Sequence, residues 1–152
     1  MTGQLVRHST TYGDAAVDGL LAGFGAGVVM GVYLAGVGLL WGEGPGAVLA
    51  RFSLCGEAPA VQGALTHLAV AGVYGVTGGL LYHTWRRFPW LQSLPAALCG
   101  LGYGLFLLAV AQGVFATGIS VPLSQVPPLQ MATAHALYGL SLGALLGRSR
   151  KA

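Results

Sequence analysis

The chain has 152 residues, of which 55% are hydrophobic and only 7% are charged, and its mean hydropathy is +0.71. Soluble domains carry about 25% charged residues, so this composition excludes a soluble globular protein and indicates one embedded in a bilayer. The formal net charge of +3 comes from basic residues near the ends of apolar segments. We therefore interpret this charge as a signal of membrane topology and expect no nucleic-acid partner.

Four long apolar segments follow a short polar N-terminal tail, and they predict four membrane-spanning helices, since a helix needs roughly 20 apolar residues to cross the hydrocarbon core. Their expected ranges are 16–41, 63–83, 95–118 and 131–147. The first loop is rich in Gly and Pro, and within it residues 47–54 could form a short amphipathic segment on the membrane surface. The predicted fold class is all-α, an integral membrane four-helix bundle that forms a single domain over residues 1–152.

The basic residues lie on one side of this four-span topology, with the single exception of Arg51. The residues on the common side are Arg7, Arg86, Arg87, Arg148, Arg150 and Lys151. Loops rich in Lys and Arg remain in the cytoplasm. The pattern therefore predicts a bacterial or archaeal cytoplasmic membrane protein whose N- and C-termini are both cytoplasmic.

Two pairs of segments suggest an internal repeat. Residues 23–27 in the first span and 100–104 in the third both read Gly-x-Gly-x-Gly, and Tyr74-Gly75 in the second span matches Tyr138-Gly139 in the fourth. These matches predict two tandem helical hairpins related by an axis along the membrane normal. The alternative is that glycine-rich helices resemble one another by composition alone. The match between the histidines of spans two and four weakens the repeat, because its spacing differs by one helical turn from that of the Tyr-Gly match.

Small residues recur at every fourth position in three of the spans, which places them on one helix face. Such faces let helix backbones approach closely and gain dispersion contacts. The predicted packing residues are Gly23, Gly27, Gly31, Gly75, Gly79, Gly139 and Gly143. We expect them to pack the four helices together. The alternative is that they dock a tetrapyrrole or a partner helix.

Three polar side chains on three different spans are expected at one membrane depth. His67 lies near the outer end of the second span, His135 near that of the fourth, and Gln112 near that of the third. Polar groups in hydrocarbon face the bundle interior and find partners there. These three residues are therefore the candidate cofactor-binding site.

Three interpretations of this polar layer remain open. The side chains could hydrogen-bond across helices as structural contacts. His67 and His135 could instead be the axial metal ligands of haem b or a chlorophyll-like pigment, since imidazole is a common axial ligand. They could also form a proton-relay or small-solute site, because imidazole titrates near neutral pH.

Chemistry of the hydrolytic or ion-pumping kind has little support in the sequence. No carboxylate lies in the core of a predicted span, and no base stands beside Ser120 or Ser124. Membrane ion pumps and hydrolases usually require such groups. We therefore expect that the protein is not an enzyme.

The final helix has the form His135-Ala-Leu-Tyr-Gly-Leu-Ser-Leu-Gly143, and the chain also has a glycine-rich first helix and a basic turn with Pro before the third helix. This pattern is similar to small four-helix bacterial inner-membrane proteins over residues 17–147. The resemblance implies a multi-pass inner-membrane protein.

The preferred functional hypothesis is a non-enzymatic structural or accessory subunit, in contact with the lipid bilayer and with a membrane-protein partner or a second copy. The first alternative is a haem- or (bacterio)chlorophyll-binding electron-transfer module ligated by His67 and His135. The second alternative is a small-solute or proton transporter.

Overall fold

The computed structural model describes residues 11–53, 60–117, 123 and 126–149. These residues form helices and no strand, which confirms the all-α prediction. The helices are α1 (Tyr12–Leu40), α2 (Pro45–Ala50), α3 (Ala60–Trp85), α4 (Ala96–Ala116) and α6 (Pro128–Ser149), with a short 3₁₀ segment, η1 (Pro89–Leu91), before α4. Four of them, α1, α3, α4 and α6, are long and apolar enough to cross a membrane. The chain is therefore a multi-pass membrane protein.

The membrane helices begin where local hydrogen bonding and backbone geometry favour a start. The Thr11 hydroxyl accepts the Asp14 N–H at 3.1 Å, and the Asp14 carboxylate accepts the Thr11 N–H at 2.8 Å. This capping box satisfies two free backbone donors and starts α1 four residues before the predicted range. α6 begins at Pro128, whose fixed φ suits the first turn, and its 22 residues are sufficient to cross the hydrocarbon core.

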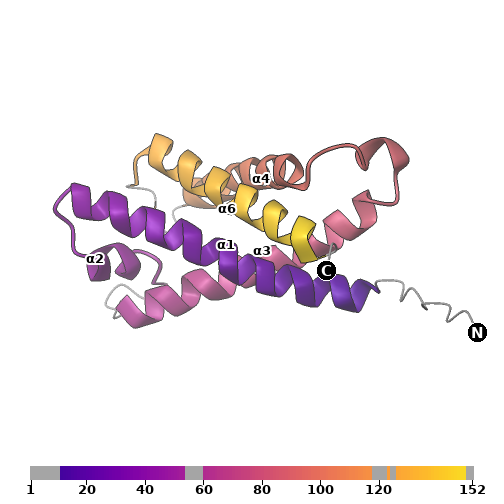
Figure 1. Ribbon diagram of the computed structural model, residues 1–152. Coiled ribbons are helices and arrows are strands. Elements are labelled where there is room, and N and C mark those ends of the chain that lie inside the picture. Colours follow the sequence, from indigo (N-terminus) through magenta and orange to yellow (C-terminus); the bar gives the residue numbers. More distant parts are fainter. Residues whose placement is uncertain (1–10, 54–59, 118–122, 124–125, 150–152) are drawn as a thin grey trace, which may run out of the picture.

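The chain folds as two antiparallel hairpins, α1 with α3 and α4 with α6, and the hairpins meet mainly where α1 packs on α6 (Figure 1). α1 begins and α6 ends at the same end of the bundle, where the connection from α3 to α4 also lies (Figure 1). We call this the basic end, because it carries Arg86, Arg87 and Arg148. The opposite end carries α2 and is called the α2 end. The cytoplasmic placement of the basic end stays a prediction.

Glycines on α1 and α3 bring the two backbones of the first hairpin into direct contact. A Cβ on Gly23 would lie 2.6 Å from the Cα of Gly75, and one on Gly79 would lie 2.7 Å from the Cα of Gly19. Real Cβ atoms do not come this close, so larger residues would force the helices apart. Gly27 continues the contact against the Cβ of Ala71, whereas Gly31 faces the ring of His67, with Nε2 at 3.5 Å from a Cβ built there.

The second hairpin repeats this backbone contact on α4 and α6. A Cβ on Gly139 would lie 2.9 Å from the Cα of Gly104, and one on Gly143 would lie 3.0 Å from the Cα of Ala97. Gly100 and Gly104 are thus seam residues that the predicted packing set does not include.

The contacts define how the two hairpins correspond. Gly75 meets Gly19 and Gly23, and in the same pattern Gly139 meets Gly100 and Gly104. Segment 100–104 therefore occupies the place of 19–23, one helical turn away from the segment 23–27 that the sequence pairs with it. The same correspondence keeps the Tyr-Gly match between α3 and α6. It makes Ala71, and not His67, the position of the first hairpin that is equivalent to His135. The two histidines are therefore not equivalent positions of a repeat.

The short helix α2 covers the first hairpin at the end opposite the basic residues. Its Val48 packs on Gly38 of α1, and its Leu49 carbonyl lies against Gly63 of α3. The Arg51 guanidinium pairs with Glu43 at 2.5 Å. The only basic residue expected on this side is thus neutralised by a local carboxylate, and the difference in charge between the two ends becomes larger.

Candidate functional site

A cavity of about 220 Å³ lies in the half of the bundle nearest α2, between α3 and α4, with α1 and α6 behind it. Its walls are mostly apolar, and the polar groups among them come chiefly from two histidines and two tyrosines. The lining residues are Met30, Phe52, Thr66, His67, Val70, Ala71, Tyr74, Leu107, Ala111, Val114, Phe115, Leu123, Met131, His135 and Tyr138. A small apolar cavity with few polar groups is typical of a binding site for a small molecule.

His67 reaches the cavity from α3 with one ring nitrogen already in use. Its Nε2 lies 2.9 Å from the carbonyl oxygen of Gly27, and because a carbonyl only accepts, this nitrogen donates the proton. Close approach of α1 and α3 through their glycines makes this contact possible. The Phe52 ring packs on the imidazole with 4.5 Å between ring centroids, which fixes its orientation.

His135 is 8% exposed and is anchored within its own helix. Its Nδ1 lies 2.9 Å from the carbonyl oxygen of Met131, one turn earlier in α6, and therefore carries the donated proton. In a neutral imidazole the second nitrogen is an acceptor. Among the described residues no hydrogen bond reaches Nε2 of His135 or Nδ1 of His67. Each ring thus keeps one acceptor nitrogen that a ligand could engage.

Gln112 does not join the two histidines. Its side chain is exposed on α4, and it is not among the residues that line the cavity. The correspondence between the hairpins gives a physical reason, since Leu108 and Gln112 stand where α1 has Gly27 and Gly31. Leucine and glutamine at these positions cannot form the close backbone contact that glycine allows, which is consistent with the exposed position of Gln112.

A layer of hydroxyl groups closes the floor of the cavity near the middle of the membrane helices. The Tyr138 hydroxyl donates to the Ala71 carbonyl at 2.7 Å, and the Tyr103 hydroxyl donates to the Tyr74 carbonyl at 2.8 Å. The Thr77 hydroxyl lies 2.5 Å from the Tyr103 oxygen. Both tyrosine bonds run from the second hairpin to α3 of the first. This tyrosine layer therefore ties the hairpins together and separates the histidine cavity from the space nearer the basic end.

The tyrosine layer was missed by the sequence reasoning, although a signal was present. Tyrosine is enriched at the membrane interfaces and not in the middle of the hydrocarbon. Tyr103 lies among apolar residues in the inner part of α4, and Tyr138 is in the third turn of α6. A tyrosine at such depth must find an internal partner for its hydroxyl, so these positions could have been singled out without a structure.

Removing either hydroxyl should loosen the contact between the hairpins by a modest amount. We expect Tyr103→Phe and Tyr138→Phe each to lower the free energy of unfolding by roughly 0.6 to 1.7 kcal/mol, the range for hydrogen bonds between membrane helices. Unfolding of the detergent-solubilised protein by added SDS measures this. Tyr33→Phe is the matched control, since the described structure gives its hydroxyl no hydrogen bond. An equal loss in all three variants would contradict a bonding role for the layer.

The described residues contain no cluster of three or more His, Cys, Asp and Glu side chains that could hold a metal ion. Two histidines alone do not complete a zinc site, which normally has four ligands.

A comparison of the chain with protein-family models, curated proteins and solved structures found no match. The fold and the cavity thus define the class, a small four-helix multi-pass membrane protein with a histidine-bearing cavity.

Proposed function

We propose that the protein is a non-enzymatic accessory subunit of the membrane that holds one small, lipid-soluble ring bearing a hydroxyl group in the histidine cavity. A quinol or phenol headgroup is the chemical class that fits. The observation that carries this proposal is the pair of histidines in one apolar cavity, each with its N–H used by a backbone carbonyl and its other nitrogen available. Two acceptors favour a ligand that donates hydrogen bonds.

The size of the cavity supports a ligand with a single ring. An engineered apolar cavity of about 150 Å³ is known to bind benzene, whereas sites for larger drug-sized molecules begin at about 300 Å³. The histidine cavity, at about 220 Å³, lies between these values. A ring could enter from the lipid between α3 and α4, and any tail attached to it would stay in the bilayer.

A binding role fits the lining better than a catalytic one. The described lining residues include no carboxylate, lysine, serine or cysteine, so the Thr66 hydroxyl in the lining has no charged base beside it there. The accessory part of the proposal rests on α4, which buries only Gly100, Gly104 and Leu107 within the chain. Apart from Gln112, its exposed side chains are apolar or small and are available to lipid or to a partner helix. A transporter is less well supported, since the tyrosine layer crosses the path between the two ends.

A decyl-substituted hydroquinone and its dimethyl ether test the proposal directly. They share the ring and the decyl chain, but only the hydroquinone can donate to the histidine nitrogens. Under anaerobic conditions we expect the hydroquinone to bind about tenfold more tightly, because a site built to bond a hydroxyl disfavours an analogue that leaves its polar groups unpaired. Titration calorimetry in nanodiscs measures both affinities.

His135→Phe provides the variant for this test, because it keeps an aromatic ring in the cavity and removes one of the two acceptor nitrogens. Because the His67 acceptor remains, we expect the preference for the hydroquinone to fall from about tenfold to about threefold, which halves the difference in binding free energy. If the wild-type protein binds the dimethyl ether as tightly as the hydroquinone, or binds neither saturably, the proposal fails.

Haem b or a (bacterio)chlorophyll is a second candidate, favoured by the same two available nitrogens on His67 and His135. The bond from Nε2 of His67 to Gly27 opposes it, because axial ligation through that nitrogen would require the bond to break. The cavity volume also opposes a tetrapyrrole, since the volume of a tetrapyrrole is several times that of a single ring. An absorption spectrum of protein expressed with haem supply separates the candidates. A Soret band lost in both His67→Ala and His135→Ala would establish a tetrapyrrole in place of the single ring.

A further inference from the structure

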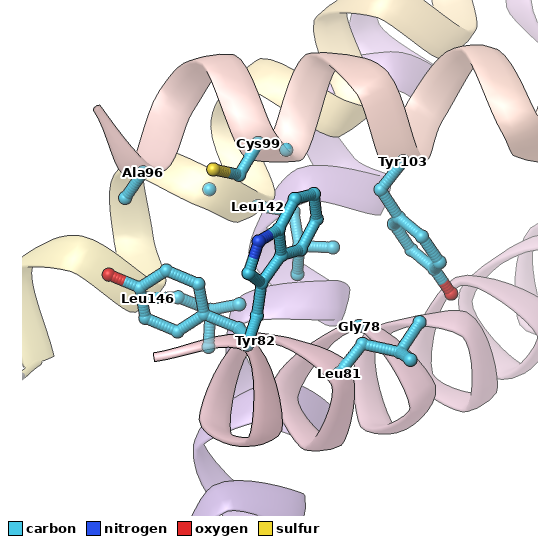
Figure 2. A pocket seen from close by; sticks show the side chains of 11 residues that line it. Gly78, Leu81, Tyr82, Ala96, Cys99, Tyr103, Leu142 and Leu146 are labelled. Atoms are coloured by element: carbon cyan, nitrogen blue, oxygen red, sulfur yellow. The ribbon is translucent and has the colours of Figure 1, made fainter. Parts of the chain in front are cut away.

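A second, smaller cavity of about 100 Å³ lies on the other side of the tyrosine layer, near the basic end. Figure 2 shows Leu81 and Tyr82 of α3 facing Ala96, Cys99 and Tyr103 of α4 across it, with Leu142 and Leu146 of α6 beside them. Almost all of its surface is apolar. We call it the basic-end cavity.

One hydrogen-bond donor at this cavity has no partner in the described structure. Trp85 lines the cavity from the last turn of α3, and its indole Nε1 is buried without an acceptor. Burying an amide-like N–H without a hydrogen bond costs free energy, and buried indole N–H groups usually find an acceptor. An oxygen supplied from outside the protein would satisfy it.

A positive charge lies next to one wall of the same cavity. The Arg86 Nη1 is 3.4 Å from the hydroxyl of Tyr82, and the guanidinium carbon lies 5.9 Å from the centroid of the Tyr82 ring. Tyr82 lines the cavity, so this guanidinium lies next to a residue of the cavity wall. The Arg86 side chain is exposed and remains open to an anion.

The neighbouring Arg87 points to a different face of α3. Its guanidinium carbon lies 5.0 Å from the Tyr12 ring of α1, and its Nη2 lies 3.5 Å from Nε2 of His83. The two adjacent arginines therefore lie on separate surfaces, one beside Tyr82 of the cavity wall and one at the junction of α1 and α3. Arg87 is thus an internal control for the effect of charge alone.

We propose that the basic-end cavity binds one anionic phospholipid. Part of an acyl chain occupies the apolar space between α3 and α4, the phosphate lies at Arg86, and an ester or phosphate oxygen accepts the N–H of Trp85. A Trp and an Arg at a helix end mark the depth of the lipid headgroups, and basic residues at that depth attract anionic lipid. The site is separate from the histidine cavity and does not depend on what binds there.

Quenching of Trp85 fluorescence by brominated lipid tests this inference. Trp41→Phe and Trp90→Phe leave Trp85 as the only tryptophan, and both replaced side chains are largely exposed, at 78% and 73%. The protein is placed in mixed bilayers in which either the phosphatidylglycerol or the phosphatidylcholine is brominated. We expect brominated phosphatidylglycerol to quench at least twice as strongly as brominated phosphatidylcholine at equal mole fraction.

The two arginines distinguish a specific site from general attraction. Arg86→Gln should remove the preference for phosphatidylglycerol, whereas Arg87→Gln, which takes away the same charge one residue further along, should retain it. Equal quenching by the two lipids in the Trp85 protein would overturn the proposal. An equal loss of preference in both arginine variants would also overturn it, because the effect would then be the field of the basic end and not a site.

Cys99 gives an independent readout in protein that keeps all its tryptophans. In a Cys55→Ser background, phosphatidylglycerol should slow alkylation of Cys99, whose sulfur lies at the cavity, more than phosphatidylcholine does. Trp85→Phe should reduce this protection, because it removes the N–H donor and leaves only a smaller aromatic ring. Protection that is the same for both lipids, or unchanged in Trp85→Phe, would contradict the arrangement.

Discussion

Gly104→Val should separate α4 from α6 and lower the free energy of unfolding by about 3 kcal/mol or more. A Cβ at this position would lie 3.0 Å from the Cα of Gly139 and still closer to the His135 carbonyl oxygen. Overpacking a core usually costs 1–3 kcal/mol, because side chains can shift. Here the opposing atoms are backbone, so relief requires the whole helix to move.

Gly102→Val, two residues away on the same helix, is the matched control. Apart from its own chain neighbours and the surrounding backbone of α4, no atom of the described structure lies within 4 Å of a Cβ built at Gly102, so the new side chain would point into lipid. We expect its unfolding free energy to stay within about 0.5 kcal/mol of the wild-type value, as for substitutions away from packed features. SDS-induced unfolding followed by circular dichroism measures both. Equal stability of the two variants would mean that the α4–α6 seam is not in close backbone contact.

The sequence predicted the helices well because the bilayer imposes a simple requirement. Every backbone group within hydrocarbon must be bonded internally, so a long apolar segment becomes a helix. Four such segments therefore indicated the all-α fold and the pair of hairpins. The helix ends were displaced by a few residues where local chemistry decided them, as at the Thr11 capping box and at Pro128.

The register of the seams was harder to predict, for a physical reason. α1 has glycine or alanine at 19, 23, 27, 31 and 35, so several alignments offer an equally smooth face. Contacts with α3 select one of them, and that choice depends on which side chains elsewhere fill the remaining space. The one-turn displacement of segment 100–104 is the result. It also explains why His67 and His135 share a cavity without being related positions.

The polar site was predicted only in part, because helix depth is readable from sequence and helix rotation is less so. Depth placed His67, His135 and Gln112 at a similar level. Rotation then brought the histidines to the cavity and left Gln112 exposed. The hydroxyl bonds of Tyr103 and Tyr138 join residues from different hairpins, and no local pattern specifies such a pair.

Leu142→Ala should cause the second large loss of stability, about 2–3 kcal/mol. Leu142 is 1% exposed and is the largest side chain that the described structure buries completely. Truncating a buried leucine costs 2–5 kcal/mol in soluble proteins through lost transfer energy and through the cavity left behind. In a bilayer the transfer contribution is small, because lipid is as apolar as the core, so the lost dispersion contacts should dominate and place the result near the lower limit.

Leu98→Ala is the control for this prediction, since Leu98 is 55% exposed on α4 and lipid can fill the space it leaves. We expect it to cost less than about 0.5 kcal/mol. Leu142→Met, which conserves volume, should cost less than about 1.5 kcal/mol. Leu142 lines the basic-end cavity, so Leu142→Ala enlarges the proposed lipid site. Part of the lost free energy of unfolding should therefore be recovered in bilayers that contain phosphatidylglycerol. A Leu142→Ala protein as stable as Leu98→Ala would show instead that this part of the bundle is loosely packed, and would weaken the case for a shaped cavity beside it.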